Sequence, residues 1–225
     1  MCASTTPSTT GELMSEFHFY ETAQGHGLAF DPIKAIVAPR PIGWISSVDA
    51  DGRVNLAPYS FFNAFSSRPP IVGFSSEKLS DSLHNAQATG EFVFNLVTAD
   101  LAEVMNATSE AVAPEIDEMQ LAGIEAAPCR LVRAPRVAAS PASFECKVLQ
   151  VIHLHDLDGK PTRSHLVLGQ VVAVHIDKAY LRDGRFDTAK AQPLARCGYL
   201  SDYAVVRELF DMPRPSQRAA AEGSR

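Results

Sequence analysis

A run of small hydroxyl residues beside one lysine is the clearest candidate for chemistry in this sequence. It reads SSEKLSDS (residues 75–82) and lies between a strand-like segment and a predicted helix start. The free N–H groups and the dipole of a helix N-terminus favour an anion, and Lys78 adds a positive charge. The run is therefore typical of a phosphate-binding cradle. The alternative is a polar loop with an ordinary helix cap at Ser80.

A second candidate precedes it in the segment RPIGWISSVDADGRVNLAPYSFFNAFSSRPPIVGF (residues 40–74). Small polar side chains beside aromatic ones suit a flat, polar-edged aromatic ligand. The polar candidates are Ser46, Ser47, Asn55, Ser60 and Asn63. In a strand Ser46 and Ser47 face opposite sides, so at most one of the two hydroxyls points into a given pocket. Hydrogen bonding within turns and strand ends is an equally good interpretation.

The histidines give only a weak indication of a metal site. His153 and His155 would share one face of a strand, which is chelating geometry, but no third ligand is evident, so we predict no metal. His165 is a candidate for a ligand contact or an interface bond. His26 could lie over a pocket mouth or be an ordinary loop residue.

Hydrolytic machinery is not evident either. No Ser/His/Asp order or Cys/His arrangement stands out, and the close carboxylate pairs lie mainly in predicted turns.

The elements that must position these residues are mostly strands. Two strand-like runs flank the turn at Asp49–Gly52, and Asp-Gly is a strong hairpin signal. Further strands are expected at residues 71–75, 92–97, 143–155 and 163–176, the last two joined by a turn at residues 156–160. Helices are expected at residues 80–90, 100–109 and 201–210, with one helical turn near Met119 in an otherwise irregular stretch. Residues 17–27 are expected to form an irregular arm lying on the domain.

This pattern favours a mainly β fold. Closure into a small antiparallel barrel, with short helices in the connections, would remove exposed strand edges. A doubly wound α/β fold is disfavoured because no Gly-x-Gly-x-x-Gly follows a strand.

Composition limits the partners. The net charge of −6, with no basic block, disfavours nucleic acid and anionic membrane surfaces, and no apolar run is long enough to cross a bilayer. Four scattered cysteines favour reduced thiols in a cytoplasm. We expect a disordered leader (residues 1–16), one domain (17–210) and a flexible tail (211–225).

The run RPIGWISS…DG…NLAPYSFFNAFSSRPPIVGFSS, followed by KLSDSLHNAQATGEFVFNLV, resembles the flavin-reductase-like family of FMN-binding split-barrel proteins. The resemblance extends over residues 17–210 and includes GHGL at Gly25, PRV…SP…FEC from Pro135 and PLAR…Y near Leu194. It implies a homodimer of split β-barrels, antiparallel Greek-key barrels with short connecting helices, in which FMN binds near the dimer interface.

The resemblance also implies roles for single residues. Ser46, Ser47 and the backbone around Pro58, Tyr59 and Ser60 would contact the isoalloxazine and ribityl parts of FMN, and Asn63 falls in the same wall. Ser75, Ser76, Lys78 and Ser82 would bind the phosphate. Arg196 and Tyr199 would lie near the cofactor, in the same subunit or its partner. Family members often have Thr at the positions of Ser47 and Ser82, which leaves the hydroxyl in place but removes a methyl group.

The implied activity is NAD(P)H-dependent reduction of flavin or of a small acceptor, with hydride transfer through flavin N5 and no catalytic side chain. A flavin-dependent monooxygenase is a further candidate partner. The alternative is a non-catalytic FMN carrier that exchanges electrons with a protein. An FMN-dependent biosynthetic oxidase is a weaker alternative, because the second basic phosphate pocket that it needs is not evident.

Overall fold

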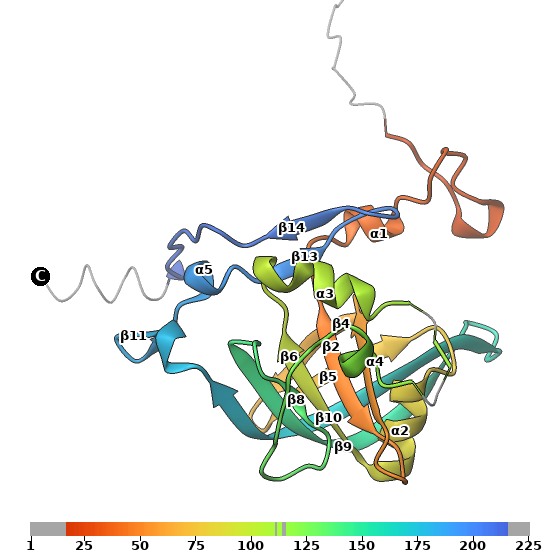
Figure 1. Cartoon of the computed structure of the whole chain (residues 1–225). Coiled ribbons are helices and arrows are strands. Elements are labelled where there is room, and N and C mark those ends of the chain that lie inside the picture. The colour runs from red at the N-terminus through yellow and green to blue at the C-terminus, as the bar shows by residue number, and fades with distance from the viewer. Residues whose placement is uncertain (1–16, 111, 114–115, 216–225) are drawn as a thin grey trace, which may run out of the picture.

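Within the residues that the computed structural model describes (17–110, 112–113 and 116–215), the chain is mainly β-sheet. Seven strands form one antiparallel sheet in the order β3-β2-β6-β9-β10-β5-β4. Figure 1 shows this sheet curved into a barrel, with short helices at its ends and flanks. The predicted mainly β barrel is confirmed. The strands are β2 (Gly43–Val48), β3 (Val54–Tyr59), β4 (Phe62–Ser67), β5 (Pro70–Ser76), β6 (Glu91–Leu96), β9 (Ala142–His155) and β10 (Pro161–Ile176).

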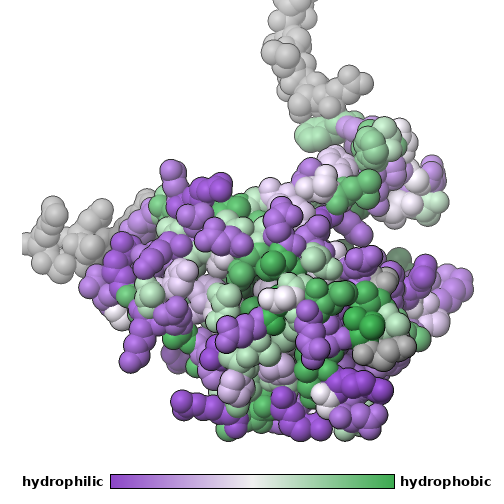
Figure 2. Space-filling model, in the orientation of Figure 1, coloured by the Kyte–Doolittle hydropathy of each residue, from purple (hydrophilic) through white to green (hydrophobic). Residues whose placement is uncertain are grey.

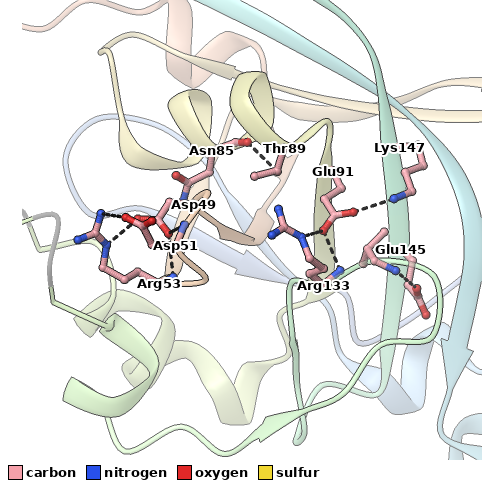
Figure 3. Close-up of polar contacts among 10 residues, drawn as sticks. Asp49, Asp51, Arg53, Asn85, Thr89, Glu91, Arg133, Glu145 and Lys147 are labelled. Carbon is pink, nitrogen blue, oxygen red and sulfur yellow. Dashed lines mark hydrogen bonds and ion pairs between the residues drawn. The ribbon is translucent and has the colours of Figure 1, made fainter.

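The first predicted hairpin is the β2–β3 pair. Its turn closes with a hydrogen bond from the N–H of Gly52 to the carbonyl of Asp49, and Gly52 has φ +87°, which glycine adopts without strain. The Asp49 carboxylate accepts hydrogen bonds from the N–H groups of Asp51 and Arg53 and from the Arg53 guanidinium (Figure 3). The Arg53 N–H and guanidinium lower the pKa of Asp49, so its carboxyl group stays ionised and accepts the hydrogen bonds that close the turn.

The second predicted hairpin, β9–β10, provides the longest strands. It pairs His155 with Pro161 at its tip and Ala142 with Ile176 at its base. On its other side β10 pairs with β5, with His165 opposite Ser76. The hairpin therefore connects the middle of the sheet to the strand that leads into the predicted phosphate cradle.

Helix α2 (Asp81–Thr89) begins and ends where the sequence predicts. Ser80 is the N-cap and accepts a hydrogen bond from the N–H of Leu83, while Gly90 has the left-handed C-cap conformation, with φ 70°. Leu83 and Ala86 are fully buried in the barrel core with Ile45, Phe74 and Phe92. Burial of this apolar face fixes the helix start beside the end of β5.

A buried carboxylate at the start of β6, shortly after this helix, forms ion pairs with two basic side chains. Glu91, 4% exposed, accepts a hydrogen bond of 2.7 Å from Lys147 and another of 2.7 Å from the N–H of Arg133 (Figure 3). Burial alone would raise the pKa of Glu91, but these donors outweigh it and lower the pKa. The ion pair ties β6 to β9 and to the loop before β8.

A second core cluster lies on the other face of β2. Trp44 and Leu56 pack there against Met105 of α3 (Ala102–Ala107) and Met119 of α4 (Glu118–Leu121). The indole N–H of Trp44 donates to the hydroxyl of Thr108 at 2.9 Å. The predicted helical pattern at residues 100–109 and the helical turn near Met119 are confirmed, the former as η2 (Ala99–Leu101) followed by α3.

The helix predicted at residues 201–210 is wrong. This stretch contains β14 (Tyr203–Val205), which pairs with β13 (Leu194–Arg196), and β13 pairs in turn with β1 (Arg40–Pro41). Tyr203 and the β-branched Val205 favour strand, and the pairing partner was not visible locally. The remaining short elements are η1 (Thr22–Gln24), α1 (Ile33–Ile36), β7 (Ala126–Ala127), β8 (Arg136–Val137), η3 (Lys178–Tyr180), β11 (Leu181–Arg182), β12 (Arg185–Phe186) and α5 (Thr188–Ala191).

The N-terminal arm also differs from the prediction. Residues 17–27 extend away from the barrel (Figure 1), and Phe17 and Phe19 are 85% and 82% exposed. Apolar side chains are visible on the projecting arm in the space-filling view (Figure 2). Its ring contacts are internal, between His18, Tyr20 and His26. The aromatic side chains of this segment are therefore not packed against the barrel core.

Other expectations concern the ends of the chain and its cysteines. The predicted leader (1–16) and most of the tail (216–225) lie outside the described residues, so the domain division stays a prediction.

Cys129, Cys146 and Cys197 carry free thiols, whereas Cys2 is outside the described part. No helix in the described ranges combines the length and the apolar character that a bilayer crossing requires.

Candidate functional site

Three hydroxyl groups meet where β5 ends and α2 begins. The phenol of Tyr59 lies 2.8 Å from the hydroxyl of Ser80, and the Ser76 hydroxyl lies 3.1 Å from that same group. Ser76 also donates to the carbonyl of Lys78 at 2.8 Å, which fixes the loop between strand and helix. Residues 75–81 of the predicted run, which we call the cradle, therefore form a preformed turn of hydroxyl and N–H groups.

The cradle forms one wall of a cavity of about 410 Å³, which we call the cradle cavity. Residues 57–61 of β3 and the following turn form a second wall, and Thr108, Ser109, Glu110 and Val112, after α3, close the site. The side chain of Lys78 is exposed and forms no ion pair with any carboxylate that the structure describes. Its charge is therefore available to an anion at this end of the cavity.

Acidic residues line the cradle cavity as well. Glu77, Asp81, Glu110 and Glu118 all contribute to its wall. Glu118 is buried, its pKa is raised by that burial, and it accepts a hydrogen bond of 3.0 Å from the N–H of Leu56. The cavity thus has hydroxyl, N–H and lysine donors at its cradle end, where Glu77 and Asp81 also lie, and further carboxyl groups at Glu110 and Glu118.

Tyr59 lies between the cradle and the barrel core. Its ring packs on Phe74 at a centroid distance of 4.7 Å, and burial raises the pKa of its phenol, although hydrogen bonds from serine hydroxyls oppose that effect. The phenol therefore stays protonated at neutral pH and can donate a hydrogen bond. It is not a base.

The structure brings seven of the predicted residues to this cavity. They are Asn55, Pro58, Tyr59, Ser60, Ser75, Ser76 and Lys78. Their contact with a cofactor stays a prediction, because no ligand is present, but the sequence segments around residues 58–60 and 75–78 do meet.

Three predicted serines lie behind the cavity wall. Ser46, Ser47 and Ser82 are each 0% exposed. Ser46 donates to the carbonyl of Pro135, Ser47 accepts from the amide of Asn85 at 3.1 Å, and Ser82 accepts from the amide of Asn55 at 2.8 Å. Because their hydroxyls are closed off by these partners, we now expect them to position α2 and β2 and not to contact a ligand.

Two further predicted residues lie elsewhere. Asn63 is exposed on β4, where its side-chain oxygen accepts a hydrogen bond from the N–H of Ala64. Arg196 lies not in the cradle cavity but in an adjoining one, together with Tyr199. This second cavity, about 350 Å³, shares Lys34, Pro58, Ser60 and Ser109 with the first.

The sequence placed Ser80 in the cradle run and offered a helix cap as its alternative role, and the structure gives its hydroxyl both roles. The capping signal was visible, but its contact with Tyr59 depends on tertiary folding. Lys34, from α1, carried no signal at all. It reaches the site because the chain before β1 folds back over residues 58–61.

The histidines do not form the chelate that their spacing suggested. The rings of His153 and His165 stack at 4.1 Å, and His153 is hydrogen bonded to the carbonyl of Thr162. His165 Nδ1 is buried and unpartnered among the described atoms. His26 lies in the arm.

A different group of possible metal ligands, Cys129, Glu145 and His175, lies within 4.8 Å. The Glu145 carboxylate there already accepts hydrogen bonds from the N–H groups of Arg130 and Val132 and from His175. Burial raises the pKa of the Cys129 thiol to about 11, so it stays protonated. We interpret the group as an anchor for the loop at residues 130–132.

Comparisons with known proteins agree with this architecture. The flavin reductase like domain matches residues 37–190. An uncharacterised protein of Deinococcus radiodurans is 34% identical over 213 residues, covering 89% of this chain and 91% of its own. The 2-nitrobenzoate 2-nitroreductase of Pseudomonas fluorescens is 27% identical, with a TM-score of 0.72, covering 82% of this chain and 89% of its own.

Nitrilotriacetate monooxygenase component B from Bacillus cereus superposes with a TM-score of 0.76 at 24% identity, covering 94% of this chain and all of that one. At that identity the likeness shows the fold, and it confirms the split β-barrel expected from the sequence. The family match extends over more than half of the chain, from the segment before β1 to α5. The protein belongs to the flavin reductase like domain family.

Proposed function

We propose that the protein is an FMN-binding oxidoreductase that uses NAD(P)H to reduce flavin or a small acceptor. The observation that carries the proposal is the preformed cradle at the N-terminus of α2, with the Ser76 and Ser80 hydroxyls and the unpaired Lys78 at one end of the cradle cavity. Hydroxyls, helix N–H groups and a lysine are the donors that a phosphate monoester requires.

The rest of the cavity also fits FMN. Its volume of about 410 Å³ lies within the range of cofactor sites. The carboxyl groups of Asp81 and Glu118 are acceptors for the hydroxyl groups of a ribityl chain, and Pro58, Tyr59 and Phe61 offer apolar contact for a planar ring. The phosphate, the ribityl chain and the ring plane of FMN therefore each have complementary residues in the cavity.

When bound, FMN would supply the redox chemistry, taking up hydride and passing electrons to an acceptor. The chain itself would bind and orient. No histidine or cysteine occurs among the described residues that line the two cavities, and the Tyr59 phenol stays protonated. A site whose described lining contains no histidine or cysteine suits a reaction whose chemistry belongs to the cofactor.

Family membership supports the proposal, as do the functions of similar proteins. The Pseudomonas fluorescens protein is a nitroreductase, and the Bacillus cereus protein is a monooxygenase component. A small acceptor, free flavin and a flavin-consuming monooxygenase are accordingly the three acceptors that we propose to test.

We also propose that the protein is a homodimer in the cytoplasm. The β9–β10 hairpin leaves six apolar side chains between 36% and 51% exposed, an unusual number for two adjacent strands. They are Leu149, Ile152, Leu154, Val172, Val174 and Ile176. A second copy would cover them, and the free thiols of the described cysteines suit a reducing compartment.

The test has two steps. Purified protein titrated with FMN should quench flavin fluorescence at a single saturating site, and protein that binds no FMN would end the proposal. Anaerobic stopped-flow mixing of the FMN-loaded protein with NADH and with NADPH should then bleach the flavin rapidly. Reduction only by another redox protein would instead identify an electron carrier.

A further inference from the structure

The cavity beside the cradle cavity is basic. Three cationic side chains, those of Lys34, Arg40 and Arg196, line its volume of about 350 Å³, and none of its described lining residues is acidic. The other lining residues are Ile42, Pro58, Ser60, Met105, Asn106, Ser109, Tyr199, Leu200 and Tyr203. We call it the basic cavity. Its charge contrasts with the chain as a whole, whose net charge is −6.

Arg40 is the most constrained of the three cations. It is 7% exposed, and its guanidinium donates to the carbonyl groups of Lys34, Val37 and Cys197. Its Nε is buried without an acceptor, and no carboxylate in the described ranges pairs with it. Carbonyl dipoles solvate this charge but do not cancel it, so it contributes a fixed positive potential.

The other two cations are also poorly neutralised. Arg196 donates to the carbonyl groups of Tyr199 and Leu200 and lies 4.6 Å from the ring of Tyr203, with no acidic partner among the residues seen. Lys34 has Glu77 at 3.9 Å, but both side chains are half exposed, so solvent screens that pair. Glu103 does not line the basic cavity; it lines a neighbouring cavity that shares Arg196 with it and forms no ion pair with Arg196.

The basic cavity adjoins the proposed flavin site. Lys34, Pro58, Ser60 and Ser109 line both cavities, so a molecule in the basic cavity lies beside one in the cradle cavity. A positively charged recess at that place would select the reaction partner of the flavin by its charge.

We propose that the basic cavity binds the anionic group of the second substrate, either a phosphate of the nicotinamide dinucleotide or the carboxylate of an acceptor. This inference rests on the proposed function, since it assigns the neighbour of the flavin. Arg196 and Lys34 provide charge-assisted hydrogen bonds to that group, and Arg40 provides the fixed field behind them.

The experiment compares the FMN-loaded wild type with Arg196→Gln, Lys34→Gln and the control Arg207→Gln. Arg207 is exposed and lines neither cavity, so the control removes the same formal charge as each test variant at a remote position. FMN affinity is measured first for every variant. Arg196→Gln also removes the hydrogen bonds to the carbonyl groups of Tyr199 and Leu200, which could loosen that turn. Lys34→Gln leaves those bonds in place and therefore tests the assignment independently.

Two pairs of probes separate the two sources of the anion. In the reductive arm, NADH and NADPH differ only in the 2′-phosphate. In the oxidative arm, chemically reduced protein is mixed with 2-nitrobenzoate or with uncharged nitrobenzene. Loss of one charge-assisted contact should raise the apparent Kd of the anion that binds here about tenfold or more.

Each outcome has a defined meaning. A larger Kd for NADPH alone assigns the 2′-phosphate, an equal rise for NADH and NADPH assigns the pyrophosphate, and a rise for 2-nitrobenzoate but not nitrobenzene assigns an acceptor carboxylate. Unchanged Kd values for all four probes, or equal effects in Arg207→Gln, would overturn the assignment while FMN binding stays intact. A wild type that binds no FMN would overturn the proposed function, and this inference with it.

Discussion

The side-chain amide of Asn55 on β3 donates a hydrogen bond of 2.8 Å to the fully buried hydroxyl of Ser82 on α2. This bond ties the first turn of the helix to the strand that forms the opposite wall of the cradle cavity. The Ser82 hydroxyl therefore helps to position the cradle.

Ser82→Ala tests that role. The variant leaves the buried amide of Asn55 without its acceptor, which should lower the free energy of unfolding by about 1–3 kcal/mol in urea titrations. FMN affinity should fall only through the loosened helix start. A variant of normal stability that had lost FMN binding would instead show that Ser82 contacts the cofactor, as the family resemblance implied.

Lys78→Ala removes the one lysine of the cradle. FMN affinity should weaken by about 1–3 kcal/mol, the range for a hydrogen bond to a charged group, with stability unchanged because the side chain is exposed. Fluorescence quenching of FMN measures the effect, with Lys178→Ala as a matched surface control. Equal affinity in both variants would place the phosphate elsewhere.

Gly43→Ala tests how tightly β2 approaches β4. A Cβ at this position would lie 2.6 Å from Cδ2 of Phe62, whose ring stacks on Phe94 at 4.6 Å and has little room to move. We expect a loss of about 1–3 kcal/mol in urea unfolding, as for other overpacked cores. Adding Phe62→Leu should recover part of it, and no recovery would argue against this contact as the cause.

Glu91→Gln tests the buried ion pair. The hydrogen bonds from Lys147 and Arg133 hold the folded-state pKa of Glu91 below its usual value of 4.5, so the stabilisation is fully present above that pH and is lost as pH falls through the folded pKa. The variant should be less stable than wild type by about 1–3 kcal/mol at pH 7, and this difference should shrink as the pH falls through the lowered folded-state pKa of Glu91. The exposed Glu208→Gln provides the control. A difference independent of pH would exclude the ion pair as its origin.

Leu149→Lys tests the proposed dimer. A charge in the exposed apolar surface of the β9–β10 hairpin should shift the molar mass, measured by light scattering after gel filtration, from two chains to one. Leu209→Lys, at an exposed position after β14, should leave the dimer intact. Wild type that elutes as one chain would contradict the homodimer directly.

Local signals in the sequence were sufficient for much of the fold. The Asp49–Gly52 turn, the capped helix between Ser80 and Gly90 and the two long strands all depend on neighbouring residues, and all form as expected. The helix prediction for the stretch after Ser201 was wrong because strand β14 depends on its pairing with β13, a contact that forms only in the folded chain.

The site was predictable as two segments but not as a set of contacts. Alternation indicated that Ser46 and Ser47 face opposite sides, yet only the structure shows that both sides are occupied, one by Pro135 and the other by Asn85. The approach of Lys34 and Arg196, from opposite ends of the chain, depends on the small sheet of β1 and β13. No local pattern encodes that meeting.

The three carbonyl acceptors of Arg40 have a consequence for where the folding unit ends. The family match covers residues 37–190, but two of the acceptors belong to Lys34 and Cys197, outside that range. A fragment trimmed to the matched residues would keep the buried guanidinium and remove most of what solvates it. We therefore expect the smallest stable form of this protein to extend beyond the matched residues at both ends.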